Sequence, residues 1–284
     1  MGASLILSRE SNLYGTLAEV SRQKRCVFFA GLSGVGKSLL LQQLALVALE
    51  AGRTVHVIQW DIARRPFETA SVLARYPERD GVTHAGIRKA VGLWAREAIG
   101  KWDHHYADDS HLLIGETPLI GNRLIELAQP RSDAVESLLA ADSTEFLIPA
   151  PSKSVRAAIE GSRGREMQLP AHERERANAA LHLVRAHWRE IRDAAQTLGT
   201  SKPPLDEDYD PGVYVGVYRH ILRHRHSEEL PVDVVLQVGG SAQELPSVTS
   251  ELSATPQEVD SIIGELSTVD DADLARDVEN WYRQ

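Results

Sequence analysis

The stretch VFFAGLSGVGKS at residues 27–38 decides the fold of this chain, because an apolar run leads directly into a glycine-rich loop. The loop satisfies the pattern G-x-x-x-x-G-K-[ST] at Gly31, Gly36, Lys37 and Ser38. The glycines let the backbone curl so that successive N–H groups point into one concavity, and a following helix directs its positive end to the same point. The pattern therefore predicts a loop that binds a polyphosphate.

The residues of this loop are expected to hold ATP and Mg²⁺ together. Lys37 would reach the β- and γ-phosphates, and the Ser38 hydroxyl would take one coordination position on Mg²⁺. The expected nucleotide-binding residues are Gly31, Ser33, Gly34, Val35, Gly36, Lys37, Ser38 and Leu39.

The segments around the loop predict an α/β fold built on a parallel sheet. Residues 39–51 are so apolar that they indicate a buried helix, which Gly52 would end, and residues 54–61 read as a second strand. A strand, a helix of this length and another strand require parallel pairing. A five-stranded P-loop NTPase sheet flanked by helices is expected, with strands near 25–30, 54–60, 111–115, 144–149 and 232–238.

Composition excludes several classes of protein. With 43% hydrophobic and 25% charged residues the chain is typical of globular proteins, and its single cysteine, Cys26, excludes an internal disulfide. No apolar run reaches the ~20 residues that span a bilayer, so a cytoplasmic protein without a membrane partner is expected. Residues 242–284 carry ten carboxylates against two arginines, which leaves the rest nearly neutral and does not indicate a nucleic-acid partner.

The chain divides into three parts on these patterns. Residues 1–24 are expected to be an N-terminal extension, 25–241 the nucleotide-binding domain and 242–284 an acidic helical tail. Amphipathic spacing predicts helices at 11–22, 82–102 and 171–198, and shorter helices are expected at 119–129, 132–141 and 212–224. Association into a homo-oligomer is left open.

Two carboxylates follow strands of the predicted sheet. Ligands of parallel α/β sheets gather at the carboxyl ends of the strands, where Asp61 and Glu116 lie. Asp61 would act as a general base or hold Mg²⁺ through water, although it also suits the N-cap of a helix that begins at Ile62. Glu116 would bind the metal or the acceptor. The predicted metal ligands are Ser38, Asp61 and Glu116.

Two arginines lie where a predicted helix is interrupted. The sequence GSRGR at residues 161–165 is expected to break the helix that Ser152 begins, and it carries Arg163 and Arg165. A mobile cover bearing these arginines would clamp a transferring phosphoryl group and exclude water. The alternative is a solvated basic face.

The loop and the end of the second strand together carry a resemblance. The sequences GLSGVGKS at 31–38 and QWDIAR at 59–64 resemble those of the adenylylsulfate kinases and related P-loop nucleoside and nucleotide kinases, which carry G-L-S-G-x-G-K-[ST] and D-G-D-x-x-R. Asp61 matches the second acid and Arg64 the arginine, while Gln59 and Trp60 replace the first acid and the glycine. The resemblance covers about residues 25–65. It implies the strand order 2-3-1-4-5 and an acceptor bound by Asp61, Arg64 and Glu116.

The function expected from these residues is ATP-dependent phosphotransfer to a small molecule or a nucleotide-like acceptor. Its catalytic residues would be Lys37, Asp61, Arg163 and Arg165. The alternative is a P-loop ATPase that drives a regulatory or assembly change and has no phosphate acceptor. A kinase of nucleic-acid ends would need a basic channel, which the nearly neutral body of the chain does not indicate.

Overall fold

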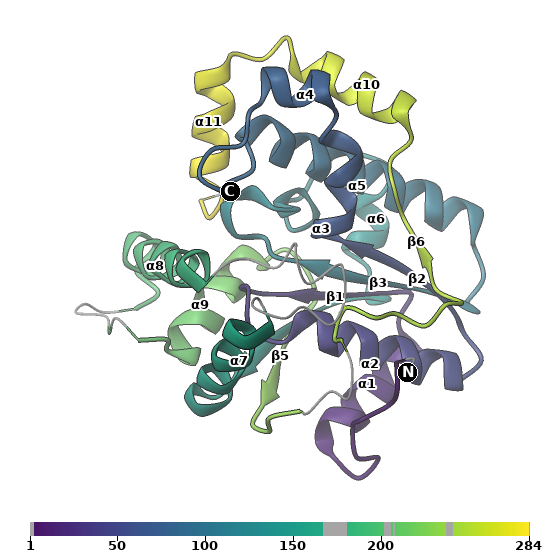
Figure 1. Cartoon of the computed structure of the whole chain (residues 1–284). Coiled ribbons are helices and arrows are strands. Elements are labelled where there is room, and N and C mark those ends of the chain that lie inside the picture. Colours follow the sequence, from purple (N-terminus) through teal and green to yellow (C-terminus); the bar gives the residue numbers. More distant parts are fainter. Residues whose placement is uncertain (1–2, 167–180, 202–205, 207, 237–240, 284) are drawn as a thin grey trace.

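A six-stranded sheet forms the centre of the computed structural model, which describes residues 3–166, 181–201, 206, 208–236 and 241–283. The strands lie in the order β5-β4-β1-β3-β2-β6, and every neighbouring pair is parallel. The fold class expected from the sequence, a parallel sheet flanked by helices, is thus confirmed (Figure 1). The strands are β1 (Cys26–Ala30), β2 (Thr54–Gln59), β3 (His111–Thr117), β4 (Thr144–Pro151), β5 (Ser227–Val232) and β6 (Ser250–Glu251).

The sheet differs from the expected five strands in two ways. A sixth strand, β6, extends the order by pairing with β2. The fifth strand covers Ser227–Val232 and not residues 232–238, of which 237 and 238 lie outside the described part. The pairing of β4 with β5 ends at Pro151 and Val232. The residues described after it, 233–236, belong to no strand, and Val234 and Val235 are exposed.

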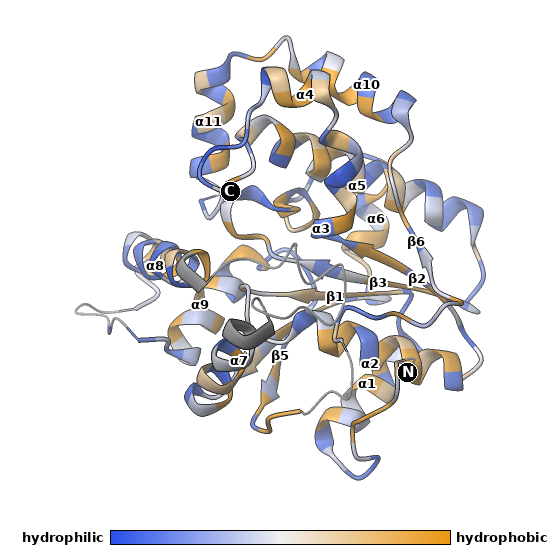
Figure 2. Ribbon diagram, viewed as in Figure 1, coloured by the Kyte–Doolittle hydropathy of each residue, from blue (hydrophilic) through white to orange (hydrophobic). Residues whose placement is uncertain are grey.

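Alternate residues of the strands point into two separate hydrophobic cores. In β1, Val27 and Phe29 face one core, whereas Cys26 and Phe28 face the other. Figure 2 shows the hydrophobic residues along β1 and β2. The first core lies under α1 (Asn12–Gln23), α2 (Lys37–Glu50) and part of α7 (Lys153–Glu166). The second lies under α5 (Ala85–His105), α8 (Leu181–Leu198), α9 (Pro211–Ile221), α10 (Pro256–Leu266) and α11 (Asp271–Glu279).

The helices expected next to the loop and before the third strand are confirmed. α2 is buried on most of its surface, and α1 begins after Ser11, whose side chain accepts a hydrogen bond from Tyr14 N. α5 buries Trp94 and Trp102 against the sheet, so these tryptophans are core residues. The shorter elements between β2 and α5 are α3 (Trp60–Ala63), η1 (Arg65–Phe67) and α4 (Ala70–Arg75).

The helix expected at 119–129 is wrong, and the one expected at 132–141 is shortened to a single turn. The chain instead forms two 3-10 turns and one short helix, η2 (Ile120–Asn122), η3 (Ile125–Leu127) and α6 (Glu136–Leu139). Leu119 and Leu124 have left-handed backbone angles, with φ of 61° and 64°. Two distant guanidinium groups hold this irregular backbone: Arg96 donates to Glu126 O and Gln129 O, and Arg225 donates to Leu127 O and Gln129 O.

The acidic C-terminal helices α10 and α11 lie beside α5 (Figure 1). β6 lies in the sheet, and α10 and α11 join the second core through buried side chains that include Ile262 and Leu274, followed by Trp281 just after α11. Their carboxylates pair with basic side chains of other elements. Lys101 Nζ lies 2.6 Å from Glu258, and Lys89 pairs with Asp277. None of the helices in the described ranges has the length and hydropathy of a membrane-spanning segment.

Candidate functional site

The glycine-rich loop joins β1 to α2 at the carboxyl edge of the sheet. Gly34 and Gly36 have φ of 82° and 88°, a left-handed conformation that strains residues with a Cβ atom. Gly31 is required for a different reason, because the side chain of Tyr214 fills the space of its missing Cβ. α2 begins at Lys37, so its first N–H groups lie at the loop.

Glu116 lies beside the loop and contacts polar side chains of the loop and of β2. Parallel pairing places Glu116 opposite both Phe29 of β1 and Gln59 of β2. Ser38 Oγ donates to Glu116 Oε2 at 2.9 Å, and Gln59 Nε2 donates to the same oxygen at 3.3 Å. Lys37 Nζ donates to Leu32 O at 2.8 Å and lies 3.6 Å from Glu116 Oε1. The structure thus brings together Lys37, Ser38 and Glu116, which the sequence placed on two separate elements.

Asp61 follows the last residue of β2. The strand β3 lies between β2 and β1, the strand that leads into the loop. Asp61 belongs to the first turn of α3, whose N-cap is Gln59, so the N-cap interpretation of Asp61 is wrong. Its side chain is 41% exposed, and its Oδ1 lies 3.6 Å from Arg64 Nε. Partial burial raises the pKa of Asp61, and the charge of Glu116 acts in the same direction, while Arg64, Lys37 and Arg123 lower it. A carboxylate with a raised pKa is suited to accept a proton.

Two further arginines lie beyond Asp61, and no motif in the sequence marks them. Arg88 Nη1 donates to Gly121 O at 2.6 Å and Arg123 Nη1 donates to Ile120 O at 3.1 Å. Burial and the charge of Arg123 lower the pKa of Arg88 to about 10, and burial lowers the pKa of Arg123. Arg88 Nε makes no hydrogen bond to any residue in the described ranges. The charge of Glu190 raises the pKa of both arginines and so neutralises part of their charge. The second, uncompensated cation of the pair favours an anionic ligand.

The arginine cover expected at residues 161–165 is not formed as a hinge. α7 runs without a break from Lys153 to Glu166 through Gly161 and Gly164, so the expected interruption is wrong. A continuous ladder of helical hydrogen bonds tolerates isolated glycines at a cost of ~1 kcal/mol each. The backbone of Arg163 and Arg165 belongs to this helix, but their side chains lie outside the described part, as do residues 167–180.

Arg156, in the first turns of α7, is the arginine that reaches the loop. Its guanidinium carbon lies 3.3 Å from the position that a Cβ atom would take on Gly34. The side chain is 3% exposed, pairs with Glu160 at 2.7 Å and lies over the ring of Tyr209. Its Nη1 atom is buried and has no hydrogen-bond partner among the described residues. The signal in the sequence was weak, an arginine four residues before a glutamate.

The oxygen donors at the loop fit Mg²⁺ shared with a phosphate. Mg²⁺ prefers oxygen ligands and usually takes one or two from the protein, with water and phosphate completing the octahedron. The Ser38 hydroxyl and the Glu116 carboxylate are in contact, and Asp61 is close enough for its pKa to respond to Glu116. Within the described residues there is no group of three or more His, Cys, Asp or Glu side chains that could hold a metal by itself.

Comparison of the chain with protein-family models, with curated proteins and with solved structures gives no match. The class of protein therefore follows from the geometry alone. The chain is an α/β protein whose parallel sheet, flanked by helices, carries a glycine-rich loop, carboxylates and arginines at one edge.

Proposed function

We propose that the protein is an ATP-dependent phosphotransferase that uses Mg²⁺ and acts on a small molecule or a nucleotide-like acceptor. One observation carries this proposal: Asp61 and Arg64 follow β2, and β3 with Glu116 lies between them and the loop. The width of β3 therefore separates the nucleotide phosphates from the base Asp61. An acceptor would bind in the space between them.

The loop would hold the nucleotide. Its N–H groups and Lys37 would bind the β- and γ-phosphates, and Arg156 would add a second positively charged side chain behind Gly34. Ser38 would coordinate Mg²⁺ together with Glu116, to which its hydroxyl is hydrogen-bonded. When bound, the cation neutralises the charge that develops on the transferring phosphoryl group. Lys37 would exchange its contacts with Leu32 O and Glu116 for contacts to phosphate oxygens.

The acceptor would lie between Asp61 and the two arginines beyond it. Asp61, with its raised pKa, would take the proton of the attacking hydroxyl. Arg64 lies against Asp61 and would orient it, while Arg88 and Arg123 would hold a negative group of the acceptor. ATP hydrolysis does not require Arg88 and Arg123, because water carries no negative group for them to hold. The presence of these two arginines therefore favours phosphotransfer over an ATPase.

The fate of the γ-phosphate tests the proposal. Labelled ATP and Mg²⁺ are incubated with the protein alone and with a panel of acceptors that contains nucleoside monophosphates and adenylylsulfate. Label should pass to an acceptor faster than to water, and Lys37→Ala should slow the transfer by about 10² or more. Lys101→Ala, which removes an exposed lysine of α5, is the matched control. Release of inorganic phosphate alone, at a rate that no acceptor changes, would support the ATPase instead.

A further inference from the structure

Residues 241–249, which precede β6, lie across the first half of α2. Gln42 of α2 is buried, and its side-chain amide donates to Ser241 O at 2.9 Å and to Glu244 O at 2.6 Å. At the other end, Ser250 pairs with β2, and Leu252 N donates to Val57 O. We call residues 241–251 the C-terminal strap. It is fixed both to the helix that follows the loop and to the edge of the sheet.

The strap brings the side chain of Gln243 into contact with Ser38, the proposed Mg²⁺ ligand. Gln243 Nε2 donates to Ser38 Oγ at 3.1 Å, while the Ser38 hydroxyl donates to Glu116 at 2.9 Å. Gln243 N donates to Ser241 Oγ at 3.1 Å, which fixes the backbone of the residue. The Ser38 oxygen is therefore engaged both as a donor and as an acceptor by two elements that are far apart in the sequence.

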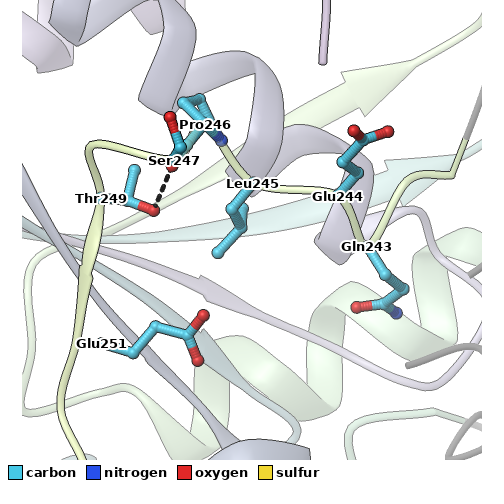
Figure 3. A pocket seen from close by; sticks show the side chains of 7 residues that line it. All are labelled: Gln243, Glu244, Leu245, Pro246, Ser247, Thr249 and Glu251. Carbon is cyan, nitrogen blue, oxygen red and sulfur yellow. Dashed lines mark hydrogen bonds between the residues drawn. The ribbon is translucent and has the colours of Figure 1, made fainter. Parts of the chain in front are cut away.

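The strap has room to shift. It curves around a cavity of about 240 Å³, and Figure 3 shows the side chains of Leu245 and Glu251 directed into the space that the strap encloses. Thr249 Oγ1 donates to Pro246 O across the bend. A local movement at Gln243 would thus use existing space, while Leu245, which packs against the first core, would stay in place. The cavity is lined by Gln243, Glu244, Leu245, Pro246, Ser247, Thr249 and Glu251.

We infer that Gln243 is a positioning residue that holds Ser38 until Mg²⁺ binds and is then displaced. The inference rests on the proposed function, in which the Ser38 oxygen coordinates the cation. A cation on that oxygen withdraws electron density from it and repels the positive end of the Gln243 N–H group. The Ser38 oxygen has two lone pairs, so this repulsion, and not the lack of a coordination position, drives the amide away or turns its carbonyl oxygen toward the metal or a metal-bound water. Metal binding at the loop and a local displacement of Gln243 within the C-terminal strap are then the same event.

Mg²⁺ titration of nucleotide binding tests the inference. A fluorescent ATP analogue at fixed concentration is bound by wild type, Gln243→Ala, Gln243→Glu and the control Gln257→Ala, an exposed glutamine of α10. Removing one competing hydrogen bond should lower the half-saturating Mg²⁺ concentration about three- to tenfold in Gln243→Ala. Gln243→Glu should lower it further, because a carboxylate attracts the cation. Affinity measured in EDTA should not change, and Gln257→Ala should match wild type.

Hydrogen exchange of residues 241–251 gives a second readout that does not depend on turnover. In wild type, exchange should be faster with the analogue and Mg²⁺ than with the analogue and EDTA. In Gln243→Ala it should be fast under both conditions.

Each contrary outcome has a distinct meaning. If wild type binds the analogue but Gln243→Ala and Gln243→Glu need the same Mg²⁺ as wild type, the inference is overturned and the proposed function stands. If wild type binds no analogue but Gln243→Ala does, the displacement of Gln243 is supported. If neither protein binds it, both the inference and the proposed function fail.

Discussion

The phenol oxygen of Tyr214 occupies the space that a Cβ atom would take on Gly31. Tyr214 is fully buried in the first turn of α9, and its hydroxyl donates to Ala30 O at 3.4 Å. α9 therefore packs directly on the first residue of the glycine-rich loop. The backbone of Gly31 does not have a positive φ, so packing and not conformation requires a glycine there.

A substitution at Gly31 should be partly rescued at Tyr214. Gly31→Ala should destabilise the fold by about 1–3 kcal/mol, because the new methyl group overlaps the phenol oxygen. Tyr214→Phe removes that oxygen, and the nearest ring carbon then lies 3.6 Å from the methyl position, while Val35 Cγ2 stays 2.9 Å from it, so the rescue is only partial. Urea denaturation of the two single variants and the double variant measures the coupling. Additive losses of stability would show that Tyr214 is not the obstacle.

Arg156 should contribute more to the rate than to stability. Arg156→Lys keeps a positive charge beside Glu160 but loses the guanidinium group that lies at Gly34, so kcat should fall at least about tenfold. The melting temperature should change little. The expectation that Arg163 or Arg165 acts in catalysis stays a prediction, and Arg163→Ala and Arg165→Ala belong in the same assay. A wild-type rate in Arg156→Lys would remove this arginine from the proposed mechanism.

The position of the acid limb of the pH–rate profile should depend on the charged side chains around Asp61. A base must be deprotonated to act, so kcat/KM should fall as the pH drops below the raised pKa of Asp61. Arg64 lowers this pKa and Glu116 raises it. The limb should therefore move to higher pH in Arg64→Ala and to lower pH in Glu116→Gln, even where the maximal rate is reduced. Limbs that stay in place in both variants would argue against Asp61 as the base.

Two histidines in contact, His56 in β2 and His111 at the start of β3, should make the stability of the fold sensitive to acid. His56 Nε2 lies 2.9 Å from His111 Nδ1, and burial followed by the charge of His111 lowers the pKa of His56 from 6.5 to about 4. Neutral His56 stabilises the fold above pH 6.5, and this contribution is lost as the pH falls from 6.5 toward 4. Its loss at pH 5 should be about 2 kcal/mol.

Urea denaturation at pH 7.5 and pH 5 checks this contribution. His56→Gln cannot titrate, so its stability should depend less on pH than that of wild type. His104→Gln, at an exposed position near the end of α5, is the control and should keep the wild-type dependence. Equal pH dependence in wild type and His56→Gln would show that His56 does not titrate as described.

Local patterns predicted the elements whose structure is set by their own residues. The loop, the buried α2 and the strands on either side of it follow from spacing within residues 27–59. The sequence alone does not explain why residue 115 is a glycine. In the structure the ring of Phe28 fills the space above Gly115 and leaves no room for a Cβ atom. Such a close approach between neighbouring strands becomes visible only when the strands are paired.

The errors come from contacts between distant segments. Residues 119–129 have helical composition, yet Arg96 and Arg225 bind their carbonyl oxygens and stabilise an irregular path. The charge of residues 242–284 was counted without its partners, such as Lys101 for Glu258, which only the fold brings near. Arg156 and Gln243 reach the loop from elements that no local pattern connects with it.

Both edges of the sheet are poor templates for another strand. β5 contains Pro231, which has no N–H group to donate, and the carboxylates Glu228 and Glu229, while β6 at the other edge has two residues. Growth of the sheet from one molecule into the next is therefore disfavoured, and with it the polymerisation that exposed strand edges cause. If copies of this chain associate, their contact should be made by helical surfaces, and concentrated solutions should stay free of fibrils.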